Sequence, residues 1–260
     1  MILLFYAFAR ELAPFKRRLE SRRAIGDAHL RGFRAQLGAT EIAGVATGIG
    51  FARTEIAARR AFDLFPDAEL VLGTGVAGAL SNGLDAGDLI VPDQILSSRA
   101  EGSTAEQVAA IDEAILRELG RCLHAAGVSY STGALLTSHR VLGTGADKRA
   151  IQRESGAIAV DMETAALALE ARARGVRFAV VRAVMDSVDD EVVGAEMADE
   201  SGNIRPLRAA NFLLRNPGVV THLPRMMQSL NRATRSLASA LEAIVTHHSR
   251  PAGHAHRESP

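Results

Sequence analysis

The stretch 157–190 constrains the fold of this chain more than any other part of the sequence. An apolar run leads into residues 165–174, which are strong helix formers, and Gly175 ends that predicted helix. Residues 177–184 then form an apolar run typical of a strand buried on both faces, interrupted only by Arg182. A buried arginine is costly unless it has a partner and a role, so this segment predicts more than a strand.

Charged residues stand where the elements of this segment meet. In open α/β sheets, ligands bind at the carboxyl ends of strands. Met162 and Glu163 at one strand end, and Arg182 and Asp186 at the next, are therefore placed to bracket a small polar ligand. A helix N-terminus also favours acidic residues through its macrodipole, and for Asp161 we prefer that simpler interpretation. Glu163, Arg182 and Asp186 are interpreted as functional residues.

Composition excludes several classes of protein. Positive and negative side chains balance at 30 each, so no overall field attracts nucleic acid. The single Cys122 excludes an internal disulfide and suits a reducing cytoplasm, and scattered histidines without cysteine pairs argue against a metal site. The apolar residues 1–9 lack a basic start and are too short to span a bilayer, so they are interpreted as the first strand. We expect a cytoplasmic protein.

Strand-like and helix-like segments alternate along the chain. Strands are expected at residues 2–8, 33–37, 41–47, 70–73, 88–92, 94–97, 130–137 and 177–184. Helices are expected at residues 10–21, 53–65, 106–126, 147–156 and 165–174. The strands at 33–37 and 41–47 are expected to form a hairpin joined at residues 38–40. This alternation predicts an α/β protein, a three-layer αβα sandwich around a mixed central sheet.

The composition changes near residue 190. Residues 189–200 are acidic, whereas residues 205–235 contain six arginines and no acidic residue. Apolar residues then recur at helical spacing: Leu223, Met226, Met227, Leu230, Leu237, Leu241 and Ile244. We expect a catalytic domain over residues 1–196, a helical C-terminal extension packed on it over 197–246, and a disordered tail over 247–260. A basic face that meets anionic lipid or a partner is the less favoured interpretation of the arginines.

Two motifs in the stretch 157–190 resemble those of a known family. Val160-Asp161-Met162-Glu163-Thr164-Ala165-Ala166 and Val180-Val181-Arg182-Ala183-Val184-Met185-Asp186 are similar to V-E-M-E-x-x-A and V-V-R-A-x-S-D. These belong to the purine nucleoside phosphorylase and nucleosidase superfamily, which includes methylthioadenosine/adenosylhomocysteine nucleosidases. Met185 replaces the usual serine, and the lost hydroxyl affects how Asp186 is held. Further matching segments place the resemblance over residues 1–190, and it implies a phosphorylase/hydrolase-like fold.

The segment Gly73-Thr74-Gly75-Val76-Ala77-Gly78 is expected to leave its strand in a sharp turn. Its backbone N–H groups would then face an anion or a sugar hydroxyl. In the resembling family, a G-x-G-x-A-G segment lines the ribose or phosphate site. The resemblance therefore implies substrate contacts for Gly75, Val76, Ala77 and Gly78, with Val76 in place of a serine. It also implies contacts for Val141, Leu142, Val160 and Met162.

The resemblance further implies a mechanism of N-glycosidic cleavage. Asp186 would protonate or hydrogen-bond N7 of the departing purine, and Glu163 would hold the ribose hydroxyls and stabilise its developing positive charge. Glu11 would activate the attacking water, although its position alone also fits an exposed acid in a first helical turn. Arg182 would either orient Glu163 and Glu11 or hold a phosphate. No cofactor is expected.

Three interpretations of the activity stay open. Hydrolysis is preferred because a carboxylate at Glu11 would repel phosphate. Phosphorolysis, with phosphate as co-substrate held by Arg10, Arg53 or Arg182, is the alternative, and a non-catalytic nucleoside-binding protein is the second. The expected substrate is a purine nucleoside, with adenine as its base.

The C-terminal segment bears on the substrate. Residues 202–206 and 212–217 and the following helix resemble the tail of hopanoid-associated phosphorylases. That resemblance implies adenosylhopane as substrate, and a soluble 5′-thioadenosine is its rival. An apolar groove from the ribose 5′ side toward the extension would favour the lipid-linked substrate. The family also implies a homo-oligomer.

Overall fold

The computed structural model describes residues 1–26, 30–98, 104–192 and 222–248. Its strands form one sheet of mixed direction. The spatial order is β2 (Glu20–Gly26), β3 (Arg31–Leu37), β4 (Thr40–Ala46), β1 (Ile2–Tyr6), β5 (Leu70–Ala79), β10 (Ala159–Asp161), β9 (Ala134–Ser138), β7 (Gln94–Ser98) and β8 (Glu106–Ala110). β11 (Arg177–Asp186) pairs with β5, and β6 (Leu89–Ile90) pairs with β11.

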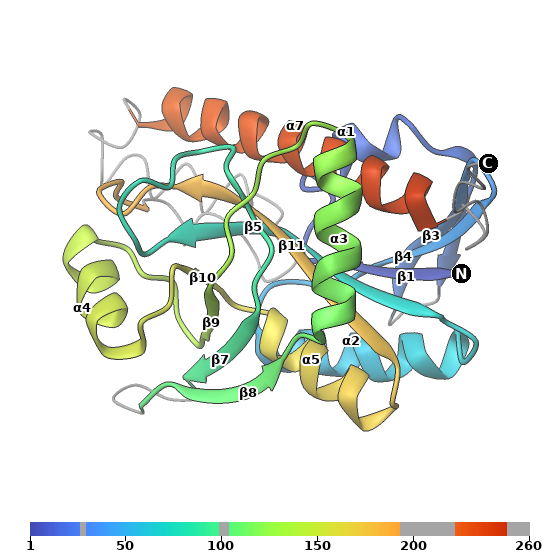
Figure 1. Ribbon diagram of the computed structural model, residues 1–260, viewed down its shortest axis with the longest axis horizontal. Coiled ribbons are helices and arrows are strands. Elements are labelled where there is room, and N and C mark those ends of the chain that lie inside the picture. Colours follow the sequence, from blue (N-terminus) through green and yellow to red (C-terminus); the bar gives the residue numbers. More distant parts are fainter. Residues whose placement is uncertain (27–29, 99–103, 193–221, 249–260) are drawn as a thin grey trace, which may run out of the picture.

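Helices cover both faces of this sheet (Figure 1). The described helices are α1 (Ala13–Lys16), α2 (Phe51–Leu64), α3 (Glu113–Ala125), α4 (Gly145–Ser155), α5 (Thr164–Ala173) and α7 (Leu223–His248). α2 and α5 lie along one face and share a buried cluster with β1, β4 and β5, while α3 and α7 pack on the other. The predicted α/β class and three-layer architecture are confirmed.

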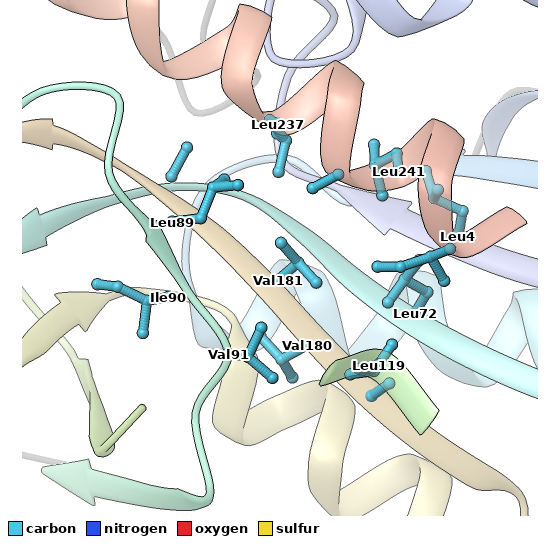
Figure 2. Close-up of a cluster of buried hydrophobic side chains, with 14 of the residues drawn as sticks. Leu4, Leu72, Leu89, Ile90, Val91, Leu119, Val180, Val181, Leu237 and Leu241 are labelled. Carbon is cyan, nitrogen blue, oxygen red and sulfur yellow. The ribbon is translucent and has the colours of Figure 1, made fainter. Parts of the chain in front are cut away.

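The C-terminal helix α7 contributes to the core. Figure 2 shows Leu237 and Leu241 of this helix above Leu4, Leu72 and Val181 of the sheet. Complete burial of a leucine stabilises by about 1.5–3 kcal/mol, which explains the helical spacing of apolar residues seen in the sequence. The opposite face of α7, with its arginines, is exposed. The motifs at 202–206 and 212–217, and the tail after residue 248, lie outside the described residues.

Two predictions of local structure are wrong. The segment 73–78 does not turn, because β5 continues through it to Ala79 in parallel register with β11, from Val180 opposite Gly73 to Val184 opposite Ala77. Residues 106–110 are not the start of a helix. They form β8, which pairs with β7, and α3 begins only after Asp112, whose carboxylate accepts hydrogen bonds from the N–H groups of Ala114 and Ile115.

The helix predicted at residues 10–21 is also shorter than expected. α1 ends at Lys16, and Glu20–Gly26 form strand β2 against β3. The predicted hairpin at residues 33–47 is confirmed, since β3 and β4 pair in antiparallel register around residues 38–39.

Along one edge of β5 the neighbouring strand changes from β1 to β10, and this change leaves a gap in the strand pairing. β1 pairs with β5 from Ile2–Leu70 to Phe5–Gly73, and β10 pairs with it from Gly78. Between these ladders, within the described part of the chain, residues 74–77 of β5 have no strand neighbour on that side. Backbone groups there must find other partners, because a buried, unpaired peptide group is costly.

Among the described residues, no helix is long and apolar enough to cross a membrane.

Candidate active site

A cavity of about 290 Å³ opens where this edge of β5 meets the ends of β10 and β11. Its walls are Ala7, Phe8, Glu11, Ile49, Val76, Ala77, Gly78, Arg140, Val141, Leu142, Lys148, Val160, Asp161, Met162, Glu163, Met185, Asp186, Val192, Met226 and Leu230. Every site residue predicted from the sequence lies on these walls except Gly75 and Arg182. Residues that are far apart in the sequence are thus brought to one place.

Glu11 is buried in the turn before α1, so it is not the exposed acid that its position alone would fit. Its Oε1 accepts a hydrogen bond from the N–H of Val76 at 3.0 Å, and its Oε2 accepts from the N–H groups of Ala7 at 2.7 Å and Phe8 at 3.1 Å. The carboxylate therefore takes the place of a strand beside β5. Burial raises the pKa of Glu11, against the opposing effects of Arg182 and these three N–H groups.

Glu163 lies between β10 and α5, and it too is buried. Its Oε1 accepts a hydrogen bond from the N–H of Gly50 at 2.8 Å, at the start of α2. Burial, together with the neighbouring Asp161, raises the pKa of Glu163 to about 8. Glu163 therefore holds a proton near neutral pH, and a positively charged ligand would favour its ionised form.

Arg182 is behind the cavity wall. Its Nη2 is 2.6 Å from Oδ2 of Asp161, and both side chains are only 1% exposed. The guanidinium also donates to the carbonyl of Thr74 at 2.9 Å and to Oγ1 of Thr164 at 2.8 Å. These contacts favour the orienting role predicted for Arg182 over a phosphate-binding role.

Asp161 does more than the simple interpretation predicted. It does accept hydrogen bonds from the N–H groups of Glu163 and Thr164 at the start of α5, as an acid at a helix N-terminus would. It also accepts hydrogen bonds from the hydroxyls of Thr137 and Thr164, and it forms the ion pair with Arg182. Asp161 is therefore the partner that the buried arginine required.

Gly75 makes room for this arrangement. A Cβ atom at this position would lie 2.4 Å from Nη1 of Arg182 and 2.5 Å from Oε1 of Glu11, and its φ of +144° is one that other residues rarely adopt. The glycine thus allows a guanidinium and a carboxylate to approach the same backbone position. Its predicted importance has a steric basis, although it does not line the cavity.

Asp186, at the end of β11, also lines the cavity. Its Oδ2 lies 2.5 Å from Nζ of Lys148, which is 1% exposed, whereas the Asp186 side chain is 13% exposed. Burial raises the pKa of Asp186, while the Lys148 ammonium opposes that rise. The carboxyl group is thus held at one oxygen and remains accessible to the cavity.

Lys148 was missed in the sequence, although a signal was present. Lysine occurs only at Lys16 and Lys148 among the chain's 30 basic Lys and Arg side chains. Lys148 also lies four residues after Thr144, the N-cap of α4, within a predicted helix of otherwise solvent-exposed character. The rarity of lysine, and the position of Lys148 shortly after predicted site residues, are the signals that favour a specific role for it.

The remaining walls are mainly apolar. Val76, Val141 and Leu142 contribute to them as predicted, and Met162 lies beside Glu163. Seven further apolar residues were not predicted: Ala7, Phe8, Ile49, Met185, Val192, Met226 and Leu230. The last two belong to α7, so the C-terminal helix forms part of the cavity wall.

The charges of the cavity decide what chemistry it can support. Two cationic residues lie on its described walls, Lys148 and Arg140. Lys148 is paired with Asp186, and Nη2 of Arg140 lies 3.5 Å from Oδ1 of Asp147. Within the described ranges, no cluster of three or more His, Cys, Asp or Glu side chains is arranged to hold a metal. The buried carboxyl groups of Glu11 and Glu163 and the partly exposed one of Asp186, beside an apolar wall, are suited to proton transfer and to stabilisation of positive charge.

A family model described as the Phosphorylase superfamily matches residues 2–215. The chain belongs to this superfamily. The expected enzymatic nature of the protein, as a nucleosidase or nucleoside phosphorylase, is confirmed by this membership together with its relatives.

The relatives are nucleosidases. The chain is 26% identical over 197 residues to the 5′-methylthioadenosine/S-adenosylhomocysteine nucleosidase of Staphylococcus haemolyticus, covering 72% of this chain and 86% of the relative. The Staphylococcus aureus enzyme of the same name is 25% identical over 213 residues, covering 77% and 91%.

Solved structures share the fold. The Neisseria meningitidis 5′-methylthioadenosine/S-adenosylhomocysteine nucleosidase in complex with methylthio-immucillin-A has a TM-score of 0.70 at 21% identity, covering 94% of this chain and 97% of that chain. The futalosine hydrolase of Helicobacter pylori has a TM-score of 0.71 at 18% identity, with the same coverage. At this identity, the two structures support the fold of the chain.

Proposed function

We propose that this protein hydrolyses the N-glycosidic bond of a purine nucleoside, with adenine as the expected base. The observation that carries the proposal is the convergence on one cavity of the buried carboxyl groups of Glu11 and Glu163 and the partly exposed carboxyl group of Asp186. Cleavage of this bond leaves a purine that needs a proton and a sugar that becomes positively charged. Separate carboxyl groups for these two needs are what such a reaction requires.

At the sugar end, Glu163 binds the ribose hydroxyls and stabilises the oxocarbenium-like charge. Met162 packs against the apolar face of the sugar. Glu11, fixed by three backbone N–H groups, accepts the proton of the attacking water. Arg182 keeps Glu163 and Glu11 in place through Asp161, Thr164 and the β5 backbone.

At the base end, Asp186 gives its proton to N7 of the purine. A carboxyl group performs this role only if it is protonated near the working pH, and burial shifts the pKa of Asp186 in that direction. Val141, Leu142 and Val160 supply the apolar surface against which the base lies.

Water is favoured over phosphate as the attacking group. Glu11 is the group assigned to activate the attacking molecule, and the N–H of Val76, a hydrogen-bond donor that could serve an anion, already donates to Oε1 of Glu11. Among the described residues, the cations on the cavity walls are Lys148 and Arg140, and neither lies in the Glu11 turn. A phosphate dianion beside Glu11 would be repelled.

The test is release of free base from adenosine, methylthioadenosine and inosine, with and without inorganic phosphate. We expect release without phosphate, and a loss of about 10²- to 10⁴-fold in Glu11→Gln. Glu20→Gln, at an exposed position of β2, serves as the control. Strict dependence on phosphate would establish the phosphorylase alternative, and binding without turnover would establish a nucleoside-binding protein.

A second candidate concerns the substrate's 5′ substituent. Phe8, Ile49, Met226 and Leu230 give the cavity an apolar wall to which α7 contributes, and this supports an adenosyl substrate with an apolar 5′ group, up to a lipid-linked one such as adenosylhopane. Each buried methylene contributes about 0.8 kcal/mol, or nearly fourfold in kcat/KM. A series of 5′-alkylthioadenosines should therefore show rising kcat/KM with chain length, whereas a constant value would exclude this candidate.

Assembly as a homo-oligomer, a cytoplasmic location and contact of the C-terminal arginines with anionic lipid stay predictions.

A further inference from the structure

Lys148 has an unusually complete set of partners. Its Nζ lies 2.5 Å from Oδ2 of Asp186, 2.7 Å from the carbonyl oxygen of Ser187 and 2.9 Å from that of Asp190. An ammonium group has three protons, and each has an acceptor here. The group is therefore fixed in position at the end of β11.

The positive charge of Lys148 is not needed merely to fasten α4 to the segment after β11. Two neutral carbonyl groups would accept from a neutral donor equally well, and burying an ammonium is costly. Two other contacts already join these segments, the exposed pair of Arg149 and Asp189 and the hydrogen bond from Val192 N–H to the carbonyl of Gly143. What the charge adds is an interaction with the carboxylate of Asp186.

Asp186 has no other side-chain donor within the described part of the chain. The preceding residue is Met185, which cannot donate a hydrogen bond, and the N–H and hydroxyl of Ser187 are both bonded to Asp190. The orientation of the Asp186 carboxyl group therefore depends on Lys148, which lies on helix α4 and 38 residues away in the sequence.

We propose that Lys148 is a positioning residue for the general acid: it holds Asp186 toward the base and stabilises the carboxylate formed when Asp186 gives up its proton. This inference rests on the proposed nucleoside cleavage. In that step the C1′–N9 bond breaks and its electron pair goes to the purine, while the O–H proton of Asp186 moves to N7. The attacking water forms the C1′–O bond and gives its proton to Glu11. The new carboxylate of Asp186 then faces an ammonium group.

The charge balance explains why both groups are kept. Burial raises the pKa of Asp186, which favours the protonated acid, and Lys148 limits that rise, which favours release of the proton. The other charged groups near Asp186 are Asp190, which raises the pKa further, and Asp189, Glu191, His222 and Arg225, which line an adjoining cavity. All of these remain in the variants described next.

The experiment compares Lys148→Met with Arg149→Met, its neighbour on the same helix. Arg149 pairs with Asp189 at the surface, so its loss tests mere loosening of the segment after β11. Each protein is given two substrates, the nucleoside cleaved by the wild type and a 4-nitrophenyl riboside, whose leaving group departs without a proton. Lys148→Gln keeps a hydrogen-bond donor without the charge, and it replaces Lys148→Met if that variant does not fold.

We expect Lys148→Met to lower the rate on the nucleoside by about 10²-fold, the lower end of general-acid effects, and to change the rate on the nitrophenyl riboside less than tenfold. The alkaline limb of its pH–rate profile should move to higher pH, because removal of the ammonium raises the pKa of Asp186. Lys148→Arg should recover part of the nucleoside rate. Arg149→Met should match the wild type on both substrates.

Equal losses on both substrates, or an unchanged alkaline limb, would overturn the inference and leave Lys148 with a structural role. A wild-type enzyme that cleaves nucleosides while Lys148→Met behaves as Arg149→Met would overturn the inference alone. A wild type that releases no base from any nucleoside would overturn the proposed function, and the role of Lys148 with it.

Discussion

Two ion pairs lie beside the cavity, and they differ in what surrounds them. The closed pair, Arg182 with Asp161, has an N–O distance of 2.6 Å, and both side chains are 1% exposed. The open pair, Lys148 with Asp186, has a distance of 2.5 Å, but its carboxylate is 13% exposed and lines the cavity. Both pairs join one cationic side chain to one carboxylate, but only the carboxylate of Asp186 is accessible.

The hydrogen bonds of the two acids explain the difference. Both oxygens of Asp161 are bonded to protein groups, from Thr137, Glu163, Thr164 and Arg182, so nothing remains for a ligand. Asp186 has one oxygen bonded to Lys148 and the other available at the cavity wall. A fully satisfied pair maintains structure, whereas a half-satisfied acid beside a cavity is able to exchange a proton with a substrate.

Neutralising each acid in turn should separate these roles most strongly. Asp186→Asn still accepts from Lys148 but holds no transferable proton, so base release should fall by about 10²- to 10⁴-fold. Asp161→Asn should chiefly lower stability. Initial rates and thermal unfolding of both variants check this. A stable, fully active Asp186→Asn protein would contradict the assignment.

Breaking the closed pair comes next in size. Arg182→Met leaves the charge of Asp161 buried without a partner, which should cost about 3–5 kcal/mol in free energy of unfolding. The double variant Arg182→Met/Asp161→Asn removes both charges and should recover part of that loss. Urea unfolding measures both, and equal stability of the single and double variants would mean that the uncompensated charge is not the cause.

A methyl group added between the closed pair and Glu11 should have a smaller effect. In Gly75→Ala the new Cβ would lie within 2.5 Å of both Arg182 and Glu11, so these groups must shift, at about 1–3 kcal/mol in stability and with a lower rate. Gly83→Ala is the matched control, because Gly83 also has a positive φ, +84°, but no atom within 4 Å of its added Cβ. Similar losses in the two variants would show that backbone strain alone is responsible.

The last comparison concerns pH and the carboxyl group beside the closed pair. Glu163 has a pKa of about 8 in the folded protein, above its ordinary value of about 4.3. The folded state therefore retains a proton that the unfolded chain has released, and this contribution to stability is lost as the pH rises from about 4.3 to 8. Glu163→Gln should show a shallower decline of unfolding free energy over that range, and an identical decline would contradict the raised pKa.

The sequence predicted the closed pair better than the open one. Arg182 lies inside an apolar run, and this pattern predicts a buried cation that needs an acidic partner. Asp161 was identified in the neighbouring motif, although only as an acid at a helix N-terminus. Lys148 lies in a polar helical segment, and nothing local reveals that the side chain is buried. Its partner becomes visible only when α4 is packed against the end of β11.

Tertiary pairing also overrode local preference in two elements. Residues 106–110 contain good helix formers, yet they pair with β7, and the acid that caps α3 comes only at Asp112. Glycines at 73, 75 and 78 favour a turn, yet pairing with β11 keeps that segment extended through Ala79. Long, regular elements such as α2 and the β3–β4 hairpin were predictable because packing and local pattern agree in them.

The carboxylate of Glu11 substitutes for a neighbouring strand along β5, and this has a consequence for how the enzyme can be observed. The amide hydrogens of Ala7, Phe8 and Val76 are all bonded to that one group. Their exchange with deuterated solvent is therefore tied to whether the group carries a proton, so three backbone signals would report on the state of the base during turnover without any label on the substrate.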